Sequence, residues 1–211
     1  MRPPKSMRGY EDFGRTRLSK HFFMRDFLFS EIAAVHGIYN VPDDPDLAIK
    51  AGRALCETLL EPLTETFGRI AIRSGLRSTT LNDFGNANAM NCASSVSDRA
   101  GHIWDRRDGN GYMGAAATVV IPWFADRYAK GRHWHDLAWW VHDHLDYSEM
   151  RFFPKLCAFN LHWLEVPKRE IRGWIGGNSV LVRAGEEPGV SLADRRAKYA
   201  DFPLFRGLDL P

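Results

Sequence analysis

The sequence has little cysteine and no long apolar run. Its three cysteines, Cys56, Cys92 and Cys157, follow no recognisable spacing, which argues against a disulfide scaffold. No apolar stretch approaches the roughly 20 residues that a membrane-spanning helix needs. The N-terminus is basic but has no apolar segment behind it, so no signal peptide is expected. We therefore expect a cytoplasmic protein with no membrane span.

The sequence also lacks an excess of charge of one sign. It has 28 Lys and Arg residues against 26 Asp and Glu residues, a formal net charge of +2. These charges are mostly interspersed, so no strong field attracts nucleic acid or anionic lipid, and no nucleic-acid partner is expected. The apolar share of 45% in 211 residues is enough for a sizeable core.

Composition divides the chain into three parts. Residues 1–17 are polar, contain Pro and Gly, and are predicted to form an extended arm. Residues 18–175 form the main domain, and residues 176–211 a C-terminal extension. The extension ends in an apolar segment from Phe202 to Gly207. Such a tail either packs along its own domain or binds a partner, so a protein partner is one expectation for residues 176–211.

Hydrophobic periodicity predicts the main helices and strands. The clearest helix covers Asp46 to Phe67, where leucines recur at helical spacing. Turn-forming residues from Asn82 to Asn91 predict a loop. The other predicted helices cover 133–145 and 191–199, and the predicted strands cover 70–74, 115–122, 147–153 and 160–165.

A short motif follows the first predicted strand. Ser74-Gly75-Leu76-Arg77-Ser78 breaks that strand with a glycine turn and places Arg77 at the strand exit. Glycine permits the sharp turn, and loops at the ends of strands often carry binding or catalytic residues. A solvent-exposed arginine is the simpler interpretation of this motif when it is considered alone.

The motifs before this turn give it a context. They are Leu18-Ser19, Gly37-Ile38-Tyr39-Asn40-Val41-Pro42 and Leu60-Glu61-Pro62, and the turn continues through Ser78 to Asn82. This order resembles the zinc D-Ala-D-Ala carboxypeptidase family, the peptidoglycan peptidases of hedgehog/DD-peptidase fold, in its phage and prophage branch. The resemblance covers residues 18–82 well and 100–175 loosely. It implies an α+β fold with an antiparallel sheet backed by helices.

The resemblance also implies a zinc site. A catalytic zinc takes three protein ligands and activates a bound water, whose proton a nearby carboxylate accepts. By resemblance, His102 and His162 are zinc ligands and Glu149 is the general base. Arg77 would stabilise the negative charge that develops in the transition state. Ser78 and Trp104, beside two of these residues, are candidate substrate-binding residues.

The sequence departs from the family pattern at the third ligand. Thr118 falls at the position of the family's Asp, Ala100 replaces a serine, and residues 103–113 look like an insertion. Asp108, or Asp105, within that insertion is the candidate replacement ligand. The alternative for Asp108 is a turn with Gly109, since Asp favours turns for backbone reasons.

Other metal ligands remain open. His142 and His144 would share one face if they lay on a strand, but the predicted helix points them in different directions. Cys92 is a weaker candidate, as a soft thiolate ligand.

Two functions follow from the resemblance. The first is a zinc-dependent peptidase-like hydrolase acting on peptidoglycan peptide cross-links, with one zinc ion, which would leave the cytoplasm through lysis or on a phage particle. The second is a catalytically inactive member of the same fold that serves as a binding or structural subunit of a larger assembly. Thr118, Ala100 and the apolar tail favour the second.

Overall fold

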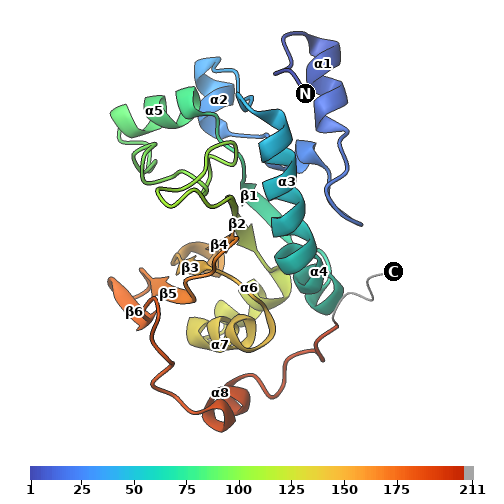
Figure 1. The fold of residues 1–211 in the computed structure, drawn as a ribbon. Helices are drawn as coiled ribbons and strands as arrows, with labels where there is room; N and C mark the ends of the chain where they lie inside the picture. Colours follow the sequence, from blue (N-terminus) through green and yellow to red (C-terminus); the bar gives the residue numbers. More distant parts are fainter. Residues whose placement is uncertain (207–211) are drawn as a thin grey trace. The chain divides into compact units, whose positions relative to one another are not determined.

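The computed structural model describes residues 1–206 and has mixed α and β structure (Figure 1). The chain divides into two compact units. Unit 1 contains residues 1–57 and 74–117. Unit 2 contains residues 58–73 and the chain from 118 onward, so the chain passes between the units three times.

Unit 1 is helical with long loops. Its helices are α1 (Met7–Gly14), α2 (Glu31–His36), α3 (Pro45–Leu55) and α5 (Thr79–Ala87), with a 3₁₀ turn, η1 (Met24–Phe27). The prediction of an extended arm over residues 1–17 is wrong because α1 forms there. Ser6 caps this helix by accepting a hydrogen bond from the Gly9 N–H, and Phe13 buries its side chain.

The core of unit 1 is built around Trp104. Its indole is fully buried, and Nε1 donates to the Ala116 carbonyl at 3.0 Å. Helix α3 passes close to the ring at Gly52, where an added Cβ would lie only 2.7 Å from Trp104 Cζ3. A glycine is therefore needed at this position for α3 to pack against the indole.

Helix α5 corrects a second prediction. Residues 82–91 were expected to form a loop because they are rich in Asn and Gly, but the helix continues to Ala87. The Ser78 side chain caps the helix by accepting from the Leu81 N–H, and Leu81 and Gly85 are buried. The cap and the buried face outweigh the low helix propensity of Asn and Gly.

The sheet lies mostly in unit 2, although Ser74 of β1 and residues 114–117 of β2 belong to unit 1, and its strand order is β1-β2-β4-β3-β5-β6 (Figure 1). Its strands are β1 (Ala71–Ser74), β2 (Gly114–Val120), β3 (Glu149–Phe152), β4 (Phe159–Leu164), β5 (Glu170–Gly173) and β6 (Ser179–Val182). Strand pairs β3–β4 and β5–β6 are antiparallel, but β3–β5 is parallel. The α+β class is therefore confirmed, whereas the expected all-antiparallel sheet is corrected to a mixed one.

Helices cover one face of this sheet. Unit 2 contains α4 (Glu61–Phe67), α6 (Pro122–Tyr128), α7 (Trp134–His144) and α8 (Leu192–Lys198). A π-helical segment, η2 (Cys56–Leu60), joins α3 to α4 along the chain, so the helix predicted over Asp46–Phe67 is confirmed. Trp134 of α7 packs on Phe152, with ring centroids 4.9 Å apart. The alternate residues on β3–β5 point to the opposite face and are half-buried.

The C-terminal extension packs along unit 2 as far as it is described. Strand β6 forms the sheet edge, and Arg195 and Tyr199, within and just after α8, bond to Asp143 of α7. Phe202 is 8% exposed and contacts the rings of Phe67, Trp123 and Phe124. Residues 207–211, at the end of the predicted tail, lie outside the described residues. Among residues 1–206, no helix has both the length and the apolar composition needed to cross a membrane.

Candidate functional site

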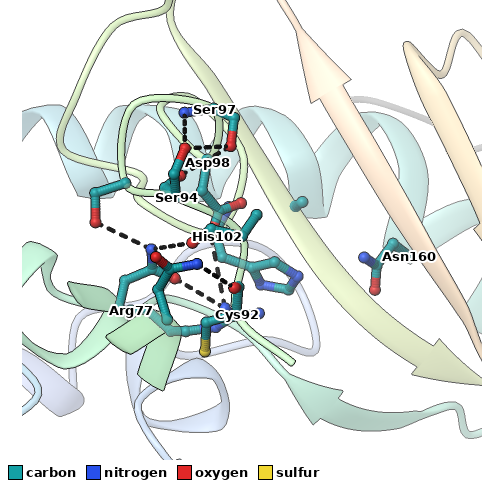
Figure 2. Close-up of polar contacts among 12 residues, drawn as sticks. Arg77, Cys92, Ser94, Ser97, Asp98, His102 and Asn160 are labelled. Atoms are coloured by element: carbon teal, nitrogen blue, oxygen red, sulfur yellow. Dashed lines mark hydrogen bonds and ion pairs between the residues drawn. The ribbon is translucent and has the colours of Figure 1, made fainter. Parts of the chain in front are cut away.

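Arg77 is held in place on three sides within unit 1 (Figure 2). Its guanidinium donates to Asn82 Oδ1 at 2.9 Å and lies 3.6 Å from Asp98 Oδ2. Its backbone N–H donates to the His102 carbonyl at 2.8 Å. The Arg77 and Asp98 side chains are 13% and 12% exposed. Arg77 therefore links the glycine turn, helix α5 and the loop that carries His102.

His102 is buried in the same loop region. Its Nδ1 lies 2.7 Å from the Gly75 carbonyl, so Nδ1 carries the proton of this hydrogen bond. Its backbone N–H donates to Asp98 Oδ1 at 3.1 Å. A backbone carbonyl on one ring nitrogen is the arrangement that commonly orients a metal-binding histidine. It is equally suited to fixing a structural histidine against the turn.

Ser78 and Trp104 have structural roles in unit 1. The Ser78 hydroxyl caps α5, and the backbone N–H of Ser78 donates to Asn40 Oδ1 at 2.8 Å. The Trp104 ring is 0% exposed, so it offers no surface to a substrate. Asn40, which the motif Gly37–Pro42 contains, also donates to the carbonyls of Leu28 and Leu76.

Asp105 fastens the start of α3. Its side chain is nearly fully buried, and Oδ2 accepts from the N–H groups of Asp43 and Asp44 at 2.6 and 3.2 Å. Burial raises the pKa of this carboxyl, while the bonds from Asp44 and Asp43 and the charge of Arg106 act in the opposite direction.

Asp108 forms the turn that its neighbours predict. Its Oδ1 accepts from the N–H groups of Asn110 and Tyr112, both at 2.9 Å. The turn interpretation is thus confirmed. The carboxylate serves the backbone of its own loop.

Thr118 pairs with Asn160 in unit 2. These residues lie on neighbouring strands, β2 and β4, and the Thr118 hydroxyl donates to Asn160 Oδ1 at 2.6 Å. Asn160 precedes His162 by two residues, so both side chains point to the same half-buried face of the sheet. The family's Asp position is therefore occupied by a hydroxyl that bonds to an amide.

Glu149 and His162 are cross-strand neighbours on that face. They pair in the register of β3 and β4, with His162 Nδ1 4.0 Å from Glu149 Oε1. Lys168 donates to the same carboxylate oxygen at 2.8 Å. Burial favours the neutral acid, but His162, Lys168 and Arg151 outweigh it and lower the pKa of Glu149. The structure thus brings together two of the predicted site residues in unit 2.

The alternative ligands have other partners. His142 and His144 lie on α7, where His142 Nδ1 contacts the Tyr147 hydroxyl at 2.7 Å and His144 Nδ1 contacts the Trp140 carbonyl at 2.8 Å. These are the separate hydrogen bonds that the helix prediction implied. The Cys92 thiol lies 3.8 Å from the Met90 carbonyl, at sulfur hydrogen-bond range.

Within either unit, the described residues do not fit the zinc site that the resemblance implies. In unit 1, Asp98 forms an ion pair with Arg77. Asp105 and Asp108 accept hydrogen bonds from backbone N–H groups. In unit 2, the hydroxyl of Thr118 replaces the carboxylate, and a neutral hydroxyl is a much poorer zinc ligand than a carboxylate.

Three residues of these clusters were missed from the sequence. Asp98 lies four residues before His102, Asn160 two residues before His162, and Lys168 follows β4 in a loop. The spacing of Asn160 from His162 was a usable signal, since it places both on one strand face. Neither Asp98 nor Lys168 had such a signal, because their partners are fixed by loop conformation.

Comparison of the chain with family models, with curated proteins and with solved structures gave no match. The likeness to the zinc D-Ala-D-Ala carboxypeptidases therefore rests on the short motifs alone.

Proposed function

We propose that the protein is a non-catalytic member of the hedgehog/DD-peptidase fold that acts as a binding or structural subunit of a larger assembly. The order of motifs from Leu18 to Asn82 supports the fold. The contacts of the Arg77 guanidinium within the protein support the absence of catalysis, and these contacts are the observation that carries the proposal. This arginine is paired with Asp98 and bonded to Asn82.

An arginine that stabilises a transition state has to direct its charge at the reacting oxygen. The charge of Arg77 is instead balanced by a carboxylate within its own loop region, with both side chains almost buried. Glu149 is also poorly suited to general base catalysis. Its lowered pKa and its bond to Lys168 weaken it as a proton acceptor at neutral pH.

The half-buried sheet face of unit 2 supports a binding role. It carries charges of both signs and neutral polar groups on adjacent strands: Thr118, Glu149, Arg151, Asn160, His162, Glu170 and Arg172. A peptide has amide, amine and carboxylate groups that such a surface can pair with. The peptide part of peptidoglycan is the ligand that the resemblance implies.

The test is to incubate purified protein with peptidoglycan and to measure two quantities, the protein that co-sediments and the soluble peptide released. We expect co-sedimentation without release, and the same result for His102→Ala. Arg151→Met should reduce co-sedimentation, whereas the matched control Lys130→Met, at an exposed turn, should not.

Release of peptide that His102→Ala abolishes would overturn the proposal in favour of the zinc peptidase. A folded protein that neither sediments nor releases peptide would overturn the choice of peptidoglycan as ligand.

A further inference from the structure

Two adjoining hollows in unit 1 form a groove along one side of α1, which we call the α1 groove. The larger hollow has a volume of about 620 Å³ and the smaller about 500 Å³. Both are lined by Met7, Tyr10, Leu28 and Phe29, so the two hollows meet along these side chains. The larger volume lies within the range of small-molecule sites, about 300–1,000 Å³. The α1 groove is therefore large enough for a small organic ligand.

Contacts at both hollows fix the walls of the α1 groove. At the larger hollow, the Tyr39 hydroxyl donates to the Pro4 carbonyl at 3.1 Å, and its ring centroid lies 5.4 Å from that of Tyr10. At the smaller hollow, Gly14 lets α1 approach η1 closely, because a Cβ added at Gly14 would lie 3.3 Å from Arg25 Cβ. The groove is therefore formed without a ligand, which lowers the ordering cost of binding one.

The walls of the larger hollow are mainly apolar. The side chains of Ala33, Ala34 and Ile38, in α2 and just after it, add to the four shared ones. Around the groove Met7 is 86% exposed and Phe29 is 64% exposed. Exposed apolar side chains that gather on one surface mark a site of interaction. An apolar chain in the larger hollow would cover them.

The polar groups of the larger hollow are mostly occupied by the backbone. The hydroxyls of Ser6 and Ser30 cap α1 and α2 by accepting hydrogen bonds from backbone N–H groups. The side chain of Asn40 bonds to the backbone at Leu28, Leu76 and Ser78. Lys5 is exposed, and a lysine can extend its ammonium group into water while its stem covers apolar surface. The larger hollow therefore suits a chain rather than a charged group.

The smaller hollow instead carries three hydrogen-bond donors, Arg8, Tyr10 and Arg25. Within residues 1–206, neither arginine forms an ion pair or a side-chain hydrogen bond, and the Tyr10 hydroxyl has no hydrogen-bond partner. Burial, and then Tyr39, raises the pKa of Tyr10, so its hydroxyl stays protonated at neutral pH and can donate. Glu11, the acidic residue that lines this hollow, pairs with Arg15. Two unpaired guanidinium groups favour an anion, and a carboxylate accepts hydrogen bonds from both.

We propose that the α1 groove binds a free long-chain carboxylate. Its carboxylate group lies at Arg8, Tyr10 and Arg25 in the smaller hollow, and its alkyl chain passes Phe29 into the larger hollow. A single free molecule fits better than a membrane surface, because the apolar side chains line a concave groove. A helix that binds a membrane surface presents them on a convex face instead.

This site is independent of the function proposed above. The residues of the α1 groove all belong to unit 1, whereas the sheet face proposed to bind peptidoglycan belongs to unit 2. Neither proposal uses a residue of the other, so each can fail alone.

The experiment is a calorimetric titration of the full chain with dodecanoate, kept below its micellar concentration. We expect saturable binding of one molecule per chain, with an unchanged circular dichroism spectrum. Octanoate should bind more than tenfold more weakly, because each buried methylene contributes about a fourfold change in affinity. Dodecyltrimethylammonium, which has the same chain and a cationic head, should also bind at least about tenfold more weakly, because its head would meet two arginines.

Substitutions separate the head site from the chain site. Arg8→Met and Arg25→Met should each weaken dodecanoate binding by about tenfold, and Tyr10→Phe by about threefold. Ala34→Glu, at an exposed position of α2, should leave the fold intact and weaken binding, because it places a charge where the chain lies. Lys50→Met is the matched control: it removes an exposed cation of α3 that lines neither hollow, so its affinity should equal that of the wild type.

Three results would overturn the proposal. The first is the absence of dodecanoate binding by folded protein. The second is equal affinity for dodecanoate and dodecyltrimethylammonium, or an affinity for dodecanoate that neither arginine variant changes. The third is flotation of the protein with phosphatidylglycerol vesicles without binding of free dodecanoate, which would assign the groove to a membrane surface instead.

Discussion

The two units contain similar polar residues and use them in different ways. In unit 1, Arg77, Asp98 and His102 contact one another and backbone groups of the surrounding loops. In unit 2, polar side chains project from one face of a sheet, where Glu149 contacts His162 and Lys168. Residues of the types that catalytic sites use therefore hold loops together in unit 1, whereas in unit 2 they lie on a sheet face where they can contact a ligand.

The difference follows from the backbone. Residues 88–113 of unit 1 form no regular helix or strand, so their N–H and C=O groups need side-chain partners. Asp98 and Asp108 meet part of this need, and Asp105 accepts hydrogen bonds from the loop that precedes α3. In the sheet of unit 2 the backbone groups pair with one another, which leaves the alternate side chains of β3 and β4 for other contacts.

The largest expected effect tests the structural role of Asp105. Asp105→Ala removes the buried acceptor of the Asp43 and Asp44 N–H groups and one of the two carboxylates that pair with Arg106. We expect the free energy of unfolding to fall by about 4 kcal/mol in urea denaturation. Asp108→Ala, at an exposed turn, should cost about 1 kcal/mol or less. Equal effects of the two changes on the free energy of unfolding would mean that the hydrogen bonds of Asp105 do not stabilise the start of α3.

A second test concerns the ion pair of Arg77. Arg77→Met leaves the nearly buried Asp98 without its cation, so unfolding free energy should fall by about 3 kcal/mol. The double variant Arg77→Met/Asp98→Asn should recover part of this loss, because the unpaired charge is gone. If Arg77→Met left the free energy of unfolding unchanged, Arg77 would not have the structural role in unit 1 on which the contrast between the units rests.

Acid should destabilise unit 2 through His142. Burial first, and then the charge of Arg169, lowers the pKa of His142 to about 4 from 6.5. The unfolded chain therefore binds a proton more readily, and stability should be lost as the pH falls from about 6.5 through about 4. The loss attributable to this residue is about 2 kcal/mol. Unfolding curves of His142→Gln at pH 7 and pH 4 should differ less than those of the wild type. An equal pH dependence in both proteins would contradict the account of His142.

The smallest effect is expected for Glu149. Its folded pKa is lowered below 4.5, so its ionised form contributes stability above that pH, and the contribution is lost as the pH falls through the folded pKa. Glu149→Gln should therefore cost about 1 kcal/mol at pH 7. The difference from the wild type should disappear in acid. A variant more stable than the wild type at pH 7 would mean that the cost of burying the Glu149 carboxylate exceeds the stabilisation from its contacts with His162 and Lys168.

Much of the secondary structure was predictable from periodicity. The helices over Asp46–Phe67 and 133–145 and the strands near 115–122 and 160–165 are confirmed, because each has an apolar pattern of the right period. Helix α5 was missed because the count of Asn and Gly was given more weight than Ser78, a local N-cap signal, and because the burial of Leu81 depends on tertiary packing. The parallel β3–β5 pairing was missed because strand direction depends on the path of the connecting chain.

The site was predictable only in part. Glu149 and His162 are neighbours, because two half-buried strands close in sequence pair readily. The roles of Arg77, Trp104 and Asp105 were not predictable, since each depends on which loop atoms surround the side chain. Burial of Trp104 and the bond of Thr118 to Asn160 likewise require the packed structure.

The most direct test of the central proposal, that the residues resembling a zinc site do not bind zinc, is the zinc content of purified protein. It would be measured by elemental analysis without chelator, beside His102→Ala. The account predicts folded wild-type protein with no stoichiometric zinc and no difference between the two proteins. About one zinc per chain, lost in His102→Ala, would contradict it and restore the metallopeptidase.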